Sequence, residues 1–183
     1  MSQGNEFIEF PKMPRLTRDA IITEKIDGTN AQILITENGD IFTGSRSRWI
    51  TVADDNFGFA KWVEGNKDQV LKLGPGRHFG EWWGSGIQRG YNLPKGEKRF
   101  SLFNTIRWSD DSVRPEGFHC VPLLWQGTFS TQAADIVLNT LRQNGSVASP
   151  GFMRPEGIVI FHIAGNFGFK KTIEKDEVPK TML

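Results

Sequence analysis

Residues 23–30 read Thr-Glu-Lys-Ile-Asp-Gly-Thr-Asn, and the rest of the chain is organised around them. Ile21 and Ile22 lead into this stretch, and residues 31–35 leave it as a second strand-like run. The pattern predicts that Lys25 lies at a strand end or in a tight connection, beside a sheet. Taken alone, these residues favour a solvated turn, because turns select Asp and Gly, so a chemical role needs support from other stretches.

A lysine in such a position can act as a nucleophile when its amine is unprotonated. Free lysine titrates at about pH 10.4, so a neutral amine at neutral pH costs about 4–5 kcal/mol unless the surroundings favour it. Burial, a metal ion or a neighbouring cation can supply that preference. A catalytic Lys25 therefore predicts a metal or a second cation close by.

The composition is that of an ordinary globular protein. The chain has 183 residues, 38% hydrophobic and 23% charged, which is enough for one domain with a substantial core. Its 20 glycines indicate many turns and hence a strand-rich fold. The formal net charge of +1 gives no overall signal for nucleic acid, so any such contact must use a local patch.

Targeting signals are also lacking in the sequence. Cys120 is the single cysteine, which excludes an intramolecular disulfide and fits a reducing cytosol. Residues 1–10 contain acidic side chains and no apolar run, so no signal peptide is predicted. No apolar stretch is long enough to cross a bilayer. We therefore expect a cytoplasmic protein with no membrane partner.

Turn signals and apolar periodicity predict the local elements. The expected strands are residues 7–10, 31–36, 40–43, 100–108, 155–163 and 167–173, and the expected helices are residues 55–73 and 131–142. Asn38-Gly39 predicts a hairpin turn, and Gly65-Asn66 predicts a break in the first helix. Ser130 or Thr131 is the expected N-cap of the second helix, which Asn144-Gly145 ends.

Several polar residues in these elements are candidates for a site. Arg46 and Arg48 alternate in an expected extended segment and would point to one side, although two exposed edge arginines are the simpler reading. Glu81 lies in an aromatic, glycine-rich strand, where a buried carboxylate needs a hydroxyl, cation or metal partner unless it faces solvent. The last hairpin would bring Glu156 near Lys170. A local RNA track could be formed by Arg46, Arg48, Arg89, Lys95, Lys98 and Arg99.

Five of these stretches follow one known pattern in order. They are Lys25-Ile26-Asp27-Gly28, Ser45-Arg46-Ser47-Arg48, Phe79-Gly80-Glu81, Glu156-Gly157-Ile158-Val159-Ile160 and Phe169-Lys170-Lys171. Over about residues 20–177 the chain resembles the covalent nucleotidyltransferase superfamily of polynucleotide ligases and messenger-RNA capping enzymes. The sequence of residues 23–30 most resembles that of the RNA ligases, especially small phage and bacterial members. Each motif is weak singly, but five in this order are specific.

The resemblance implies a fold and a domain plan. The fold would be an α+β adenylation domain, of the nucleotidyltransferase and ATP-grasp-like type, in which two antiparallel sheets form a nucleotide-binding cleft and helices pack outside. A single mixed sheet with two helices is the alternative. Residues 1–183 would be one adenylation domain without the OB-fold domain that larger ligases carry.

The resemblance also implies an ATP-dependent RNA ligase, as in RNA repair. A lysine attacks the α-phosphorus of ATP, giving lysyl-AMP and pyrophosphate, and AMP then passes to an RNA 5′-phosphate. A 3′-hydroxyl displaces AMP and joins the ends, so the partners are RNA ends. Such chemistry depends mostly on positioning and charge neutralisation, with Mg²⁺ or Mn²⁺ as the metal. The alternatives are a DNA ligase, a capping-type nucleotidyltransferase, or an inactive homologue that binds nucleotides or RNA ends.

The first motifs would supply the nucleophile and part of the nucleotide site. Lys25 is similar to the family nucleophile, and Asn30 and Asp27 resemble residues that organise the lysine and its metal. Arg46 resembles the arginine that contacts the ribose and phosphates, with Arg48 as the less favoured candidate. Glu24 would help to read the adenine.

The later motifs would complete the site. Glu81 resembles the glutamate that accepts a hydrogen bond from a ribose hydroxyl, and Phe103 resembles the aromatic residue that stacks on adenine. Glu156 resembles the carboxylate that holds the metal. Lys170 resembles the lysine that neutralises the α-phosphate in the transition state, and Lys171 would also contact the nucleotide.

The chain departs from the family pattern at two places. Many members carry Lys-x-Lys in the last motif, whereas here Thr172 stands two places after Lys170, so either Thr172 or Lys171 replaces the second lysine. Lys170 is the favoured site residue, because adjacent strand residues face opposite ways. The strand after Phe103 reads Asn104-Thr105, where the family often has an Asp.

Overall fold

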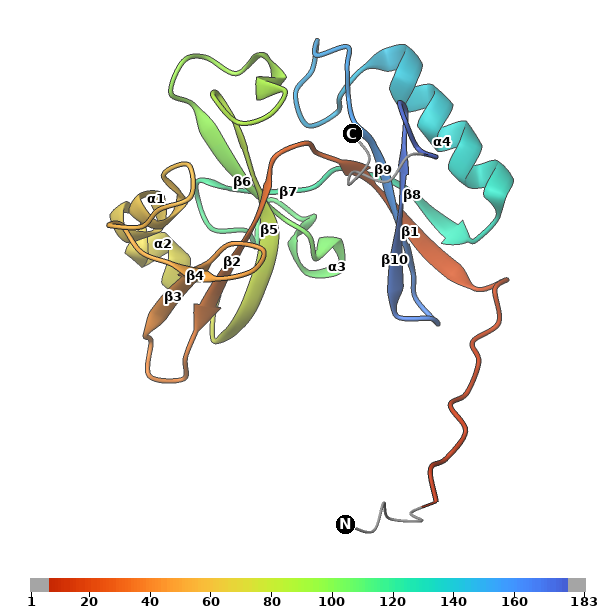
Figure 1. Cartoon of the computed structure of the whole chain (residues 1–183), viewed down its shortest axis with the longest axis horizontal. Helices are drawn as coiled ribbons and strands as arrows, with labels where there is room; N and C mark the ends of the chain where they lie inside the picture. Colours follow the sequence, from red (N-terminus) through yellow and green to blue (C-terminus); the bar gives the residue numbers. More distant parts are fainter. Residues whose placement is uncertain (1–6, 178–183) are drawn as a thin grey trace.

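The computed structural model describes residues 7–177, which form two β-sheets with helices on their outer faces (Figure 1). The first sheet has the strand order β10-β9-β1-β8, and the second has the order β4-β3-β2-β5-β6-β7. The strand pairings are antiparallel, except that β6 pairs with β7 in parallel. The two sheets confirm the predicted α+β class and exclude the single mixed sheet.

The strands differ in length between the two sheets. The first sheet contains β1 (Asp19–Lys25), β8 (Leu123–Thr128), β9 (Gly157–His162) and β10 (Phe167–Thr172). The second contains β2 (Thr29–Ile35), β3 (Ile41–Gly44), β4 (Trp49–Ile50), β5 (Gly76–Gly84), β6 (Lys98–Leu102) and β7 (Phe118–Cys120). The predicted hairpins are confirmed, since β2 pairs with β3 and β9 pairs with β10.

One face of the first sheet is covered by α4 (Thr131–Asn144). Ser130 caps this helix by accepting a hydrogen bond from the Ala133 N–H, and Gly145 follows its end, as the sequence predicts. Its apolar side packs on alternate residues of β1 and β9, namely Ala20, Ile22, Ile158 and Ile160. Because side chains alternate along a strand, Thr23 and Lys25 lie on the face opposite to α4. The second sheet is on the side of the first sheet away from α4 (Figure 1).

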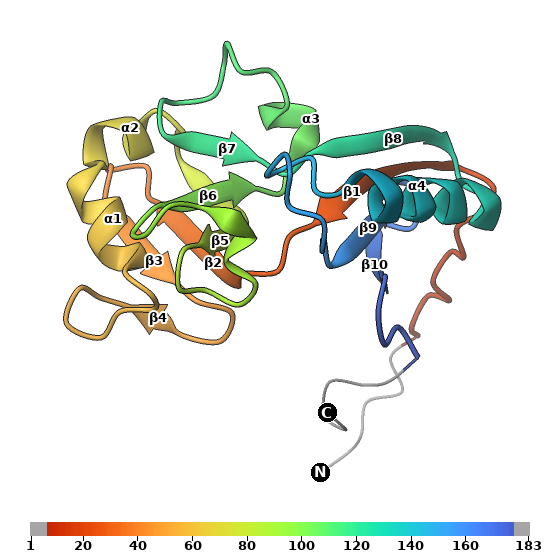
Figure 2. The ribbon, with the colours of Figure 1, turned by 90° about the horizontal axis from the view of Figure 1, so that it is seen from above.

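The outer face of the second sheet is covered by α1 (Phe59–Gly65) and α2 (Lys67–Leu71). The two helices are separated at Asn66, as the sequence predicts. The core beneath them is aromatic and aliphatic, and it includes Phe59, Val63, Val70, Ile33, Trp82 and Phe100. Seen from above, α1 and α2 lie at one end of the molecule and α4 at the other, with the sheets between them (Figure 2).

The connection between β1 and β2 joins the two sheets, so the lysine stretch lies where they meet (Figure 1). Ile26 is buried there in a third apolar cluster that includes Trp83 and Tyr91. A Cβ atom at Gly28 would lie 2.5 Å from the carbonyl oxygen of Trp82, so glycine is required for this close approach to β5. The local sequence therefore brings the end of β1 against the second sheet.

One predicted strand is absent, and a second is shorter than predicted. Residues 7–10 are exposed and have no regular structure. The strand predicted over residues 100–108 ends at Leu102, because Asn104 accepts a hydrogen bond from the Arg107 N–H and caps the short helix α3 (Thr105–Trp108). Phe103 therefore lies in a turn. Within residues 7–177, no helix combines the length and the apolar character needed to cross a membrane.

Candidate active site

Lys25 and Glu156 form an ion pair at the point where β1 ends and β9 begins. The antiparallel register places Lys25 opposite Gly157, so the preceding Glu156 lies beside the lysine. The Lys25 Nζ is 2.5 Å from the Glu156 Oε2, and the glutamate is buried. The sequence predicted that the last hairpin would bring Glu156 near Lys170. Strand register instead pairs Glu156 with a lysine 131 residues away along the chain.

Glu81 on β5 brings the second sheet into the same site. Its two carboxylate oxygens accept hydrogen bonds from the Gly28 N–H at 3.1 Å and from Asn30 Nδ2 at 3.0 Å. Burial, with a smaller contribution from the charge of Glu156, raises the pKa of Glu81 to about 7, against the lowering effect of Lys25 and these hydrogen bonds. The three ionisable groups Lys25, Glu81 and Glu156 therefore form one electrostatic unit.

Arg89 holds the turn after the lysine. It lies in the loop between β5 and the 3₁₀ helix η1 (Gly90–Asn92), and its Nε is 3.0 Å from the Asp27 Oδ2. The same guanidinium donates a hydrogen bond to the Arg154 carbonyl at 2.9 Å. Arg89 thus links the turn that follows Lys25 to the segment that precedes Glu156. From the sequence, Arg89 was predicted only as one of six basic residues that could contact RNA.

The carboxylates expected to hold a metal are engaged by cations, since Glu156 contacts Lys25 and Asp27 contacts Arg89. Within the described part of the chain, no three Asp, Glu, His or Cys side chains are grouped so that they could hold a metal. Mg²⁺ usually takes one or two protein carboxylates and completes its shell with waters and phosphate oxygens. Lys25 contacts the Oε2 of Glu156 and Arg89 contacts the Oδ2 of Asp27, so either carboxylate could hold such an ion through its other oxygen when a nucleotide supplies further ligands.

Glu24 does not share the face of Lys25. It is 1% exposed and points to the α4 side of β1, where it accepts hydrogen bonds from Ser146 Oγ at 2.6 Å, Val147 N–H at 2.8 Å and Ala148 N–H at 2.9 Å. Burial raises its pKa, and the three donors oppose that shift. Both oxygens are used inside the protein, so the geometry gives Glu24 no open face for reading an adenine.

The hydrogen bonds of Glu24 continue to the other side of the lysine. Ser146 Oγ also accepts a hydrogen bond from the Ser149 N–H, and Ser149 Oγ donates to the Tyr91 carbonyl at 2.7 Å. The Tyr91 hydroxyl in turn accepts from the Asp27 N–H at 2.9 Å. One buried network therefore holds the residues on both sides of Lys25. Sequence reasoning missed it, because no local pattern marks Tyr91 or the loop at residues 146–149.

A hollow of about 430 Å³ lies on the face of the second sheet that carries Glu81. It is lined by Asn30, Ala31, Gln32, Ser45, Arg46, Phe79 and Phe103. Its volume suits a small-molecule ligand such as a nucleotide. Another hollow, of about 360 Å³, lies at the far end of β1 from Lys25, around Arg18 and Asp19, and contains none of the predicted site residues.

The hollow brings together three predicted nucleotide contacts, Asn30, Arg46 and Phe103. Arg48 is excluded from it and pairs with Asp54 at 2.5 Å. The prediction that the two arginines share one side of an extended strand is wrong, because residues 46–48 form a bend between β3 and β4. Phe79 also lines the hollow, although its motif was noted only for Glu81.

The two lysines of the last motif, Lys170 and Lys171, lie on opposite faces of β10. Lys170 is opposite Val159, which is opposite Thr23, so Lys170 shares the face of Lys25. Lys171 faces α4, where its Nζ is 2.7 Å from the Asp135 Oδ1. Of the two candidates for the second lysine position, Thr172 is therefore the one on the Lys25 face.

Two sheets thus meet at a lysine and two buried carboxylates, beside a hollow with an arginine and an exposed aromatic residue. The chain belongs to the RNA ligase family, whose sequence profile matches residues 18–174. A search of the curated proteins finds no match to the sequence.

Solved structures of an RNA ligase from Naegleria gruberi share the fold. An arginine-to-alanine variant with ATP and Mn has a TM-score of 0.62 at 18% identity, covering 87% of this chain and 51% of that one. The ligase with PPi has a TM-score of 0.61 at 19% identity, covering 85% and 50%. A lysine-to-methionine variant with AMP and Mn has a TM-score of 0.61 at 17% identity, covering 86% and 50%. The chain spans about half the length of these ligases.

Proposed function

We propose that this protein is an ATP-dependent RNA ligase in which Lys25 becomes covalently attached to AMP. The observation that carries the proposal is the meeting of Lys25, Glu156 and Glu81 beside the hollow formed by Asn30, Arg46 and Phe103. The Naegleria structures with ATP and Mn, AMP and Mn, and PPi support ATP and a divalent metal as cofactors here.

The first step forms a P–N bond. The Lys25 amine attacks the α-phosphorus of ATP, the bond from that phosphorus to the bridging oxygen breaks, and pyrophosphate leaves. The Lys25 ammonium must lose one proton before the attack, and the Glu156 Oε2, which contacts it at 2.5 Å, is positioned to accept it. The nitrogen releases its second proton to solvent once the P–N bond has formed. A divalent ion, Mg²⁺ or Mn²⁺, would neutralise phosphate charge, and Glu156 fits it as a ligand.

The remaining site residues bind and orient the nucleotide. Phe103 stacks on the adenine, and Arg46 contacts the ribose and phosphates from the floor of the hollow. Glu81 accepts a hydrogen bond from a ribose hydroxyl while holding Asn30. Lys170 reaches the α-phosphate from the Lys25 face of the first sheet and stabilises the negative charge that develops on it. Glu24 and Asp27 position Lys25 from behind, and Lys171 lies outside the site.

The later steps pass AMP to an RNA 5′-phosphate and then join that end to a 3′-hydroxyl. Residues 18–174 act as an adenylation domain, and RNA ends are the substrates. The setting is RNA repair in a cytoplasm, which a free Cys120 fits.

The test is covalent labelling. Purified protein is incubated with α-labelled ATP and Mg²⁺ or Mn²⁺ and is run on a denaturing gel. The wild type and a Lys61→Ala control on α1 should carry label, and Lys25→Ala should carry none. Labelling by GTP in place of ATP, or an unlabelled wild-type band, would overturn the proposal. Joining of matched RNA and DNA strands then tests the substrate, and joining of DNA alone would contradict an RNA ligase.

A further inference from the structure

Four aromatic side chains are exposed on the face of the second sheet that carries the hollow. Phe42 is 47% exposed, Trp49 49%, Phe79 52% and Phe103 42%. Strand register explains why they share this face. Phe79 is opposite Gln32, Gln32 is opposite Gly44, and Gly44 is opposite Trp49, so one row crosses β5, β2, β3 and β4. Phe42 lies in the next row, opposite Leu34.

Side chains of these two rows are in contact with one another, and Arg77 belongs to the second row because it also lies opposite Leu34. Arg77 donates a hydrogen bond to the Gln32 side chain, and its guanidinium lies 5.3 Å from the centre of the Trp49 ring. The Trp49 and Phe42 rings are 6.0 Å apart. Gly44 leaves room for Gln32, since a Cβ atom there would lie 2.8 Å from the Gln32 Cγ. We call Phe42, Trp49, Arg77 and Phe79 the aromatic strip, and its Phe79 end lines the nucleotide hollow.

The charged residues along the strip are arginines, and over the residues that the structure describes two of them have no carboxylate partner that would neutralise them. Arg48 is paired with Asp54, whereas neither Arg46 nor Arg77 lies within 4.0 Å of a carboxylate among residues 7–177. Exposed aromatic rings beside unpaired arginines are what single-stranded nucleic acid uses, because bases stack on rings and phosphates attract the cations. A run of three strand spacings, about 14 Å, separates the ends of the row and leaves room for a few nucleotides.

We propose that the aromatic strip binds unpaired nucleotides of the RNA substrate, next to the end that is joined. The bases stack on Trp49 and Phe79, and Arg77 and Arg46 contact the backbone. This inference rests on the proposed function for the identity of the polymer. Continuity with the nucleotide hollow and the sign of the charge favour RNA over a protein partner on the same surface.

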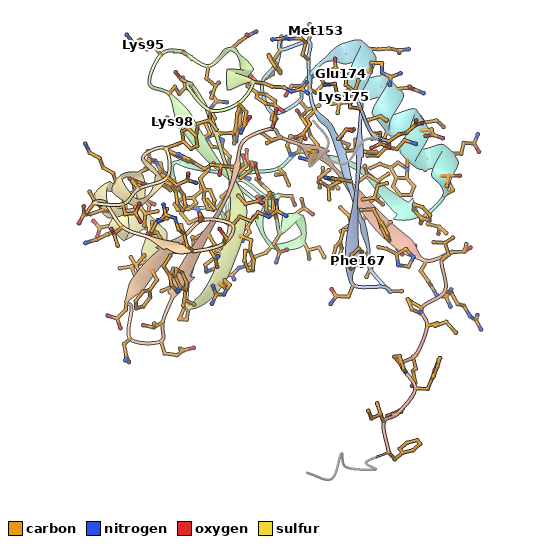
Figure 3. The ribbon with its side chains drawn as sticks, in the orientation of Figure 1. Lys95, Lys98, Met153, Phe167, Glu174 and Lys175 are labelled. Atoms are coloured by element: carbon orange, nitrogen blue, oxygen red, sulfur yellow. The ribbon has the colours of Figure 1, made fainter. Side chains whose placement is uncertain are left out.

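The test measures RNA binding rather than activity. The anisotropy of a labelled, 5′-phosphorylated single-stranded RNA is followed against wild type, Trp49→Ala, Arg77→Ala, Trp49→Phe and Phe167→Ala. Phe167 is an exposed aromatic residue (62%) of β10 in the first sheet, away from the strip, and serves as the control (Figure 3). Circular dichroism checks that each variant is folded.

Loss of stacking on Trp49 should weaken binding about tenfold, and Trp49→Phe should recover most of it, because one stacked base contributes roughly 1–3 kcal/mol. Phe167→Ala should bind as the wild type does, and blunt duplex RNA should be insensitive to Trp49. Equal binding by wild type and Trp49→Ala overturns the inference. The inference is also overturned if the wild type binds no RNA and gel filtration shows a wild-type dimer that Trp49→Ala turns into a monomer. The strip would then contact a second copy of this chain.

Covalent labelling with ATP separates the two proposals. If the wild type is labelled and its RNA affinity does not depend on Trp49, the RNA-binding role of the aromatic strip is wrong and the ligase function stands. If the wild type is not labelled but its RNA affinity depends on Trp49, the ligase function is wrong and the RNA-binding role of the aromatic strip stands.

Discussion

Glu81 couples the two sheets electrostatically, because charged residues of the first sheet change its pKa. It is buried on the second sheet, yet the charges of Lys25 and Glu156 on the first sheet both act on its pKa. Its oxygens also hold the connection between the sheets, through Gly28 and Asn30. Removing or neutralising this one carboxylate therefore changes the local electrostatics of the site on both sides.

The raised pKa of Glu81 predicts a pH dependence of stability. Burial raises this pKa from its usual 4.5 to about 7, so between these values the folded state holds more protons than the unfolded state. Stability therefore falls as pH rises through this window, by about 3 kcal/mol at most. Urea unfolding of wild type and Glu81→Gln at pH 5 and pH 8 should show the fall in wild type and its loss in the variant. Parallel curves would contradict the pKa shift.

Ser146 is predicted to support Lys25 from behind. Ser146→Ala removes a 2.6 Å donor from the buried Glu24 and should lower the free energy of unfolding by about 1–3 kcal/mol. It should also slow adenylation, because the same network holds the residues on both sides of Lys25. Ser47→Ala, at an exposed bend, is the control for urea unfolding and label incorporation. A variant as stable and as active as this control would show that the network is dispensable.

At the level of the element, β10 assigns different roles to two adjacent lysines. Lys170→Ala should reduce label incorporation strongly, because Lys170 shares the face of Lys25. Lys171→Ala should leave incorporation nearly unchanged and shift stability by less than about 1 kcal/mol, since its ion pair with Asp135 is on the surface. Single-turnover labelling of both variants measures this. A larger loss in Lys171→Ala than in Lys170→Ala would reverse the assignment.

Local sequence determined the regular elements where strong signals agree. Asn38-Gly39 made the β2–β3 hairpin, Ser130 and Gly145 bounded α4, and Gly65-Asn66 separated α1 from α2. The strand expected over residues 100–108 failed for a local reason as well, because Asn104 caps a helix instead of continuing the strand. The bend at residues 46–48 was missed, because alternate charges look alike in a strand and in a loop.

For the whole molecule, the division of the site between two sheets predicts stabilisation by nucleotide. Lys25, Glu156 and Lys170 belong to the first sheet, and Glu81 and the hollow belong to the second, so a bound nucleotide would link them. ATP with Mg²⁺ at a hundred times its dissociation constant should add about 2.7 kcal/mol, seen as a higher melting temperature. Phe103→Ala should lose most of this shift. No shift in wild type at millimolar ATP would contradict a shared site.

The sequence by itself determined the class of fold and the position of Lys25 at a strand end, and its motifs named most of the candidate site residues. These depend on neighbouring residues and on motifs whose order can be read along the chain. The tertiary structure alone decided the partners: Glu156 with Lys25, Arg89 with Asp27, Glu24 with the loop at residues 146–149, and the row of exposed rings. The paired residues lie 62 to 131 positions apart along the chain, so their contacts depend on strand register and on the packing of the two sheets, which no local pattern encodes.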